Sequence, residues 1–122
     1  MADEKANRAA FEVQSQYCDA NDAPITARLC RSIALAMDRT SQFGRAILDW
    51  PGAPVADGLA LRAAASFHAV WRDGRAPALD ALFQAVVQET AQLAATLRNI
   101  MHSHDEELTS WLDGPPQTNE PG

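Results

Sequence analysis

Apolar residues recur at every third or fourth position along four long segments of the chain, which is the spacing of one face of a helix. The first segment spans about residues 3–17 and the second about residues 25–40. The third spans residues 55–71 and the fourth residues 79–111. Charged side chains mostly fall outside each apolar stripe, so we expect amphipathic helices that pack their apolar faces together.

Proline, glycine and asparagine separate these segments. The stretches CDANDAP (18–24) and DWPGAP (49–54) interrupt the apolar pattern, and Asp73 with Gly74 forms a left-handed helix stop. A short helical turn is predicted for residues 41–48. The fourth segment is about thirty residues long, and its pattern fits either one long helix or two helices with a bend near His102.

Composition supports the same fold class. Alanine contributes 24 residues and leucine 11, a balance that favours helix over the branched side chains typical of strands. The sequence therefore predicts an all-α fold, a bundle of about four main helices joined by short helical turns, with no sheet. We expect one helical domain over residues 1–113 and a disordered polar tail over residues 114–122.

Charge, apolar length and cysteine spacing argue against several kinds of partner and location. The chain has 122 residues and a formal net charge of −6, so repulsion from phosphates argues against a nucleic-acid partner. No stretch approaches the ~20 apolar residues that a membrane helix needs, so we expect no membrane insertion. Cys18 and Cys30 match no metal or redox spacing, and the first residues have no apolar signal-peptide core. A cytoplasmic location is therefore expected.

Histidines and acids give one candidate metal site. His102, His104 and Glu106 lie close together in the sequence HSHDEE. Residues two apart on a helix point about 200° from each other, so His102 and His104 cannot share an ion on an unbroken helix. His102 and Glu106 can, with His68 as a third ligand from another helix. This spacing matches no established metal motif, so the main expectation is that there is no metal site and no cofactor.

Other polar residues have two interpretations each. His68 lies one step off the apolar stripe of its segment. A general base needs a partner within hydrogen-bond reach, and no motif supplies one, so a packed structural histidine is the favoured interpretation. Arg28 and Arg31, with Arg39 and Arg45, are the only basic concentration and could grip a phosphate or a carboxylate. Because acids are interspersed among them, a salt-bridged surface is the favoured interpretation.

Two stretches carry a family resemblance. These are LRAAASFHAVWRDGRAPAL (61–79) and PPQTNE (115–120). Their order and approximate spacing resemble the bacterial domain-of-unknown-function 2332 (DUF2332) family of uncharacterised proteins. The match falls on His68, on the DGRAP turn at residues 73–77, on His104, and on Gln117, Thr118, Asn119 and Glu120. The looser CDANDAP stretch resembles a turn of the same family.

The resemblance implies an architecture and no stated activity. Members of the family are expected to continue past the QTNE motif into a larger region, so this chain is expected to be the N-terminal helical part, an accessory domain that completes the site of a following domain. The ligand-binding or domain-docking candidates are His68, Arg75 and residues 117–120. An apolar patch lined by Trp71, Phe83 and Trp111 is expected where that partner docks.

Two alternatives remain open from the sequence. One is a small stand-alone metal-binding protein or enzyme that uses His68, His102 and His104. The other is a homodimeric interaction module, for which the long apolar face of residues 79–111 would supply the contact surface.

Overall fold

A computed structural model of the chain describes residues 2–86 and 88–113. Four long helices dominate it: α1 (Glu4–Ala20), α2 (Pro24–Ala36), α4 (Leu59–Arg72) and α6 (Thr90–Ser103). Shorter turns of helix accompany them: α3 (Gln42–Leu48), η1 (Pro77–Leu79), α5 (Asp80–Phe83), α7 (Asp105–Ser110) and η2 (Trp111–Asp113). No strand occurs among the described residues. The predicted all-α bundle of four main helices with short helical turns is confirmed.

Local sequence signals set most helix ends. The Asp3 carboxylate accepts a hydrogen bond from the Ala6 N–H at 3.1 Å and caps α1. Pro24 occupies the first turn of α2, where a missing N–H costs nothing. The Ser41 hydroxyl accepts from the Gly44 N–H at 2.9 Å and caps α3. Gly58, at φ +67°, turns the chain into α4.

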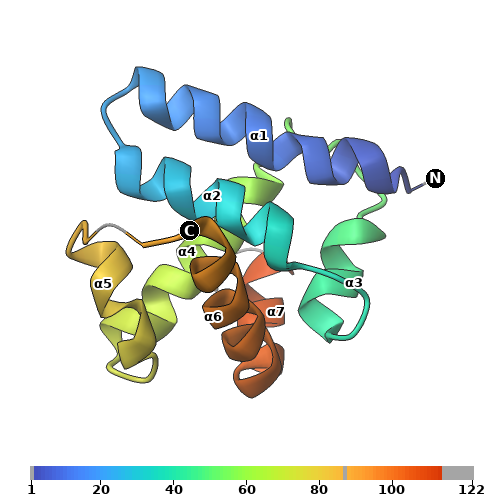
Figure 1. The fold of residues 1–122 in the computed structure, drawn as a ribbon. Coiled ribbons are helices and arrows are strands. Elements are labelled where there is room, and N and C mark those ends of the chain that lie inside the picture. Colours follow the sequence, from blue (N-terminus) through green and yellow to red (C-terminus); the bar gives the residue numbers. More distant parts are fainter. Residues whose placement is uncertain (1, 87, 114–122) are drawn as a thin grey trace, which may run out of the picture.

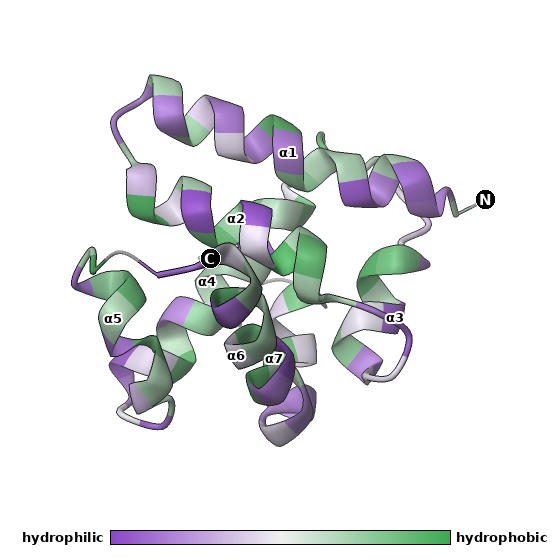
Figure 2. Ribbon diagram, in the orientation of Figure 1, coloured by the Kyte–Doolittle hydropathy of each residue, from purple (hydrophilic) through white to green (hydrophobic). Residues whose placement is uncertain are grey.

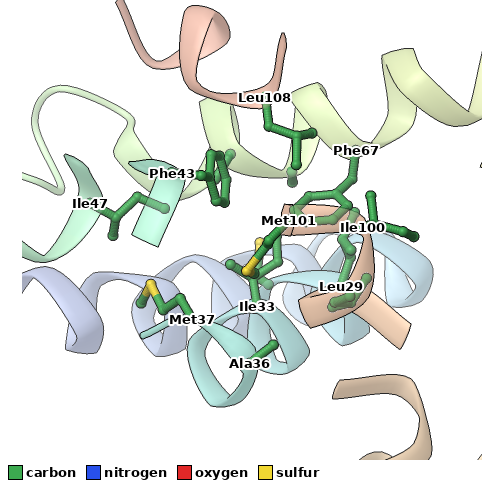
Figure 3. Close-up of a cluster of buried hydrophobic side chains, with 14 of the residues drawn as sticks. Leu29, Ile33, Ala36, Met37, Phe43, Ile47, Phe67, Ile100, Met101 and Leu108 are labelled. Atoms are coloured by element: carbon green, nitrogen blue, oxygen red, sulfur yellow. The ribbon is translucent and has the colours of Figure 1, made fainter. Parts of the chain in front are cut away.

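The helices surround one core. In Figure 1, α1 and α2 lie side by side, with α3 and α5 at opposite ends of the molecule. Each helix carries both polar and apolar residues (Figure 2), as the amphipathic pattern predicts. Side chains from five helices meet in the centre (Figure 3), among them Leu29, Phe43, Phe67, Met101 and Leu108, each at most 2% exposed. The DGRAP turn contributes Ala76 to this core, whereas none of the HSHDEE residues belongs to it.

The fourth apolar segment contains an additional break. The bend expected near His102 is present, because α6 ends at Ser103 and α7 begins at Asp105. The expectation of continuous helix before that bend is wrong. Helix α5 ends at Phe83, Ala85 adopts a left-handed φ of +60°, and α6 begins only at Thr90. No glycine or proline occurs between Phe83 and Thr90, so the sequence has no helix-stop signal at this break.

The apolar face of the fourth segment is buried within the chain. Leu79, Leu82, Leu93 and Leu97 are each at most 2% exposed, whereas Val86 is 50% exposed. The homodimer hypothesis therefore loses most of the surface on which it rested. Within residues 2–86 and 88–113, no helix combines the length and the apolar character needed to cross a membrane.

Candidate functional site

The DGRAP turn places Arg75 at the surface. Helix α4 stops at Arg72, and Gly74 takes a left-handed φ of +76° that glycine adopts at little cost. The Arg75 N–H then donates to the Val70 carbonyl at 3.2 Å, which closes the turn. Ala76 is buried and Pro77 opens η1. The turn is thus anchored on both sides while the Arg75 side chain stays about half exposed.

His104 lies at the break between α6 and α7. Its backbone, at φ −125° and ψ +32°, is not helical, and its carbonyl accepts from the Leu108 N–H to start α7. This geometry turns the chain and leaves the imidazole 21% exposed. Because α7 begins directly after this break, Glu107 lies in the first turn of α7, close to the His104 side chain.

Glu107 contacts both Arg75 and His104. One of its carboxylate oxygens forms an ion pair with the Arg75 guanidinium. Its other oxygen lies 3.8 Å from His104 Nδ1, a contact that becomes an ion pair when the imidazole is protonated. We call Arg75, His104 and Glu107 the polar site. Arg75 and His104, which both carry the family resemblance, lie 29 positions apart in the chain. In the structure both contact the Glu107 side chain.

A hollow of about 290 Å³ adjoins the polar site. It is lined by Arg75, Ala76, Pro77 and Ala78 from the turn and by Thr96, Asn99, Ile100, Ser103 and His104 from the α6 side. Apolar groups supply contact area, and the amide, hydroxyl and charged groups fix orientation, as in sites that hold small ligands or peptide side chains. Within this hollow, Arg75 is suited to a carboxylate, because its planar guanidinium has five donors and the ion pair to Glu107 uses only part of them.

His68 belongs to a different surface. Its ring lies 5.7 Å from the Trp71 ring and 5.2 Å from the Phe83 ring, measured between centroids. Trp71 and Phe83 stack at 4.4 Å, and the Trp71 indole N–H donates to Asp80 at 2.7 Å. We call His68, Trp71 and Phe83 the aromatic surface. It borders a hollow of about 240 Å³ that reaches Leu29 and Leu61.

The remaining candidate metal ligands do not gather. His102 Nε2 lies 3.1 Å from the Thr40 hydroxyl, and no described contact joins it to His104. Glu106 is exposed, and the break after Ser103 removes the four-residue helical step that would have paired it with His102. Among the described residues, no three His, Cys, Asp or Glu side chains are placed to hold a metal ion.

The Thr40 contact belongs to a local network around Asp38. The Thr40 hydroxyl and the Thr40 backbone N–H both donate to the Asp38 carboxylate. These two bonds, assisted by nearby Arg98 and His102, hold the pKa of that carboxyl below its usual value. His102 is therefore engaged in a surface network at the α2–α3 connection.

Asp105 has a structural role that the sequence did not reveal. Its two oxygens accept hydrogen bonds, both at 2.8 Å, from the backbone N–H groups of Gln42 and Phe43 at the start of α3. A carboxylate on two free N–H groups at a helix N-terminus is a favourable arrangement. This contact ties α7 to a helix 62 residues earlier in the chain.

We expect Asp105→Ala to lower the free energy of unfolding by about 1–2 kcal/mol, because the exposed N–H of Gln42 and the partly buried N–H of Phe43 both lose their acceptor. Urea unfolding followed by circular dichroism measures the change. Glu106→Ala is the matched control, since Glu106 is exposed and makes no described hydrogen bond, and it should shift stability by less than about 0.5 kcal/mol. Equal losses for both variants would contradict the capping role.

Both cysteines are buried and free. Desolvation, with a smaller contribution from Cys18 and against the opposing charge of Arg31, raises the pKa of the Cys30 thiol to about 12. A thiol that stays protonated at neutral pH is a poor nucleophile. Cys30 therefore acts as a small apolar core residue, as its 0% exposure indicates.

This thiol makes stability depend on alkaline pH. In the unfolded chain Cys30 ionises near its ordinary pKa of 9.0, whereas in the folded chain it stays protonated up to about 12. The unfolded state therefore binds fewer protons in this window, so stability falls as the pH rises through it. Between pH 8 and pH 11, we expect the free energy of unfolding of Cys30→Ala to fall by about 2–3 kcal/mol less than that of the wild type. Parallel stability curves for the two proteins would contradict this.

The proposed QTNE residues, Gln117, Thr118, Asn119 and Glu120, lie outside the described residues. Of the other predicted site residues, Arg75 and His104 come together, while His68 lies on a separate surface. Glu107, which contacts both Arg75 and His104, was not among the predicted residues. The sequence carried a signal for the His104 contact alone, because Glu107 stands three positions after His104. The contact of Glu107 with Arg75 depends on the fold.

Residues 8–122 match the family described as "Uncharacterized protein conserved in bacteria (DUF2332)". No curated protein matches the chain, and no solved structure matches it. The match covers nearly the whole chain, including both stretches that carry the resemblance.

Proposed function

The chain belongs to the DUF2332 family of uncharacterised proteins conserved in bacteria, and on that premise we propose that its helices form an accessory domain that docks onto a following region of the longer family proteins. The observation that carries the proposal is the convergence of Arg75 and His104 on Glu107 beside a hollow. In this proposal the polar site receives a carboxylate or a peptide segment of the partner region.

The ion pairs of the polar site contribute little to folding stability and are suited to binding a partner. Arg75 is about half exposed and Glu107 about one-third exposed. Ion pairs with this exposure typically add only ~0–1 kcal/mol to folding. The same charges gain in importance when a partner excludes water from them, because the effective dielectric constant around them falls.

The aromatic surface supplies an apolar counterpart. It lies on α4 and α5, the two helices that flank the DGRAP turn. Leu61 and Val86 are each 50% exposed, and the Leu61 side chain lines the hollow beside His68 and Phe83. Aromatic side chains and arginine are enriched among the residues that dominate binding energy at protein interfaces. The turn and its flanking helices therefore combine both kinds of contact, and the QTNE residues 117–120 are proposed to complete them.

The docking proposal is tested by isothermal titration calorimetry. This chain is titrated with the purified region that follows the matching helices in a full-length family member. We expect a one-to-one complex, and we expect Arg75→Ala to weaken it at least tenfold, because an arginine at the centre of an interface leaves its partner group unpaired when it is removed.

Arg39→Ala is the matched control. Arg39 is exposed to a similar degree and pairs with Glu4 at 2.7 Å and Asp49 at 2.8 Å, away from the DGRAP turn. It should leave the complex unchanged, and both variants should keep the melting temperature of the parent to within a few degrees. Absence of a complex, or equal weakening by the two substitutions, would overturn the docking proposal.

A further inference from the structure

Helix α1 carries apolar residues on two of its sides. One side is buried in the core and holds Phe11 at 0% exposure. The other side holds Ala6, Ala9, Val13 and Tyr17, which follow one another at steps of three and four residues and so form one stripe. All four are exposed, Val13 to 49% and Tyr17 to 64%. We call these four residues the outer face of α1.

Within the described part of the chain, no helix covers the outer face. Helix α1 lies at one edge of the molecule, and in Figure 1 the other described helices all lie on its lower side. Lys5, Arg8 and Glu12, like the other charged residues of α1, fall outside the stripe. An apolar surface without charges and with an exposed tyrosine has the composition of the centre of a protein interface.

Most charges on α1 are paired within the chain. The carboxylates of Glu4 and Asp19 each form an ion pair with an arginine from another part of the chain, and Arg8 donates to a backbone carbonyl of α2. Lys5 and Glu12 form no ion pair with any described residue. They stand seven positions apart, which is about two helical turns, so they lie on the same flank of the outer face.

This arrangement of charge and size is complementary to itself when the second helix runs in the opposite direction. An antiparallel copy of α1 places Lys5 beside Glu12 of the second copy, and twofold symmetry forms this pair twice. It also places Val13 against the small side chains near the start of the second α1, where alanines allow the two helices to approach closely. A parallel copy would instead place Lys5 beside Lys5 and Glu12 beside Glu12.

We propose that the chain forms a twofold-symmetric dimer in which the outer faces of two α1 helices pack antiparallel. Helix α1 has 17 residues and is about 25 Å long, so the contact is smaller than the ~800 Å² per partner of a standard interface. The dimer is therefore weak, with a dissociation constant on the order of 100 μM. Its contact surface differs from the apolar face of residues 79–111, which is buried within the chain.

The first test is sedimentation velocity of the chain at concentrations from about 10 μM to about 1 mM, which bracket this affinity. We expect the sedimentation coefficient to rise from that of a monomer toward that of a dimer. Val13→Glu should weaken the dimer at least about tenfold, because a charge would be buried in the contact. Leu35→Glu is the matched control, since Leu35 is 58% exposed on α2 and lies outside the outer face. It should leave the dimer unchanged.

Charge reversal tests the antiparallel arrangement. Lys5→Glu and Glu12→Lys should each weaken the dimer at least about threefold, because each creates two like-charge contacts across the symmetry axis. The double variant Lys5→Glu/Glu12→Lys should restore the parent affinity, since both pairs form again with their charges exchanged. All of these residues are exposed, so circular dichroism should show the helix content of the parent in every variant.

A chain that stays monomeric up to about 1 mM, or equal weakening by Val13→Glu and Leu35→Glu, would overturn the proposed dimer. A double charge reversal that dimerises no better than the single variants would overturn the antiparallel pairing of Lys5 with Glu12. The polar site and the aromatic surface contain no residue of α1, so these outcomes are independent of whether a partner region docks there.

Discussion

Gly44→Ala is expected to lower the free energy of unfolding by at least about 3 kcal/mol. Gly44 is the third residue of α3 and is buried against the connection from α2. A Cβ atom at this position would overlap the Asp38 carbonyl oxygen and would also lie 3.0 Å from the Asp38 carbonyl carbon. Because the obstructing atoms are backbone, no side-chain rotation relieves the overlap, and α3 or the loop must move.

Gly74→Ala is the control for Gly44→Ala. Gly74 adopts φ +76°, and a Cβ there would meet no atom within 4 Å. Its substitution should cost only the ~1–2 kcal/mol of a left-handed alanine. Urea unfolding of both variants measures the difference, and a smaller loss for Gly44→Ala than for Gly74→Ala would contradict the packing of α3 on the Asp38 loop.

Phe67→Ala is expected to lower the free energy of unfolding by about 3–5 kcal/mol. Phe67 is 0% exposed and lies at the centre of the core, where its ring meets the Phe43 ring edge to face at 5.7 Å and 82° (Figure 3). Removing the ring leaves a cavity between α3, α4 and α6 that rigid helices fill only in part. The loss is a large fraction of the ~5–15 kcal/mol that keeps a domain folded.

Phe83→Ala is the matched control, since Phe83 is of the same size but only partly buried at the aromatic surface. Its loss should be clearly smaller than that of Phe67→Ala, because less apolar area is removed from water at that site. Thermal and urea unfolding compare the two variants. A larger loss for Phe83→Ala would mean that the core is centred elsewhere.

Local signals in the sequence predicted the helices well. Apolar spacing gave the four long helices, and Asp3, Pro24 and Gly74 stand where the structure begins or ends them. These signals act within a few residues, so they can be interpreted without knowing the fold. The break between Phe83 and Thr90 was missed because it depends on how Leu82 and Leu93 reach the core from different helices.

In the candidate sites too, the sequence identified single residues, whereas their contacts with distant residues depended on the fold. The sequence pointed to Arg75 and His104 separately, through the family resemblance, and to Arg28 and Arg31 as a basic pair. It could not show that Glu107 joins the first two, because that contact requires the bend at His104.

The sequence by itself determined the all-α class, the long helices, the acidic charge and the family of this protein. Only the tertiary structure decided that Asp105 caps α3, that the three histidines contact different partners, and that the arginines of α2 share a hollow with the start of α6. The physical reason is range. Helix formation follows from spacing along a few turns, whereas contacts between helices depend on how their apolar faces pack across the whole core.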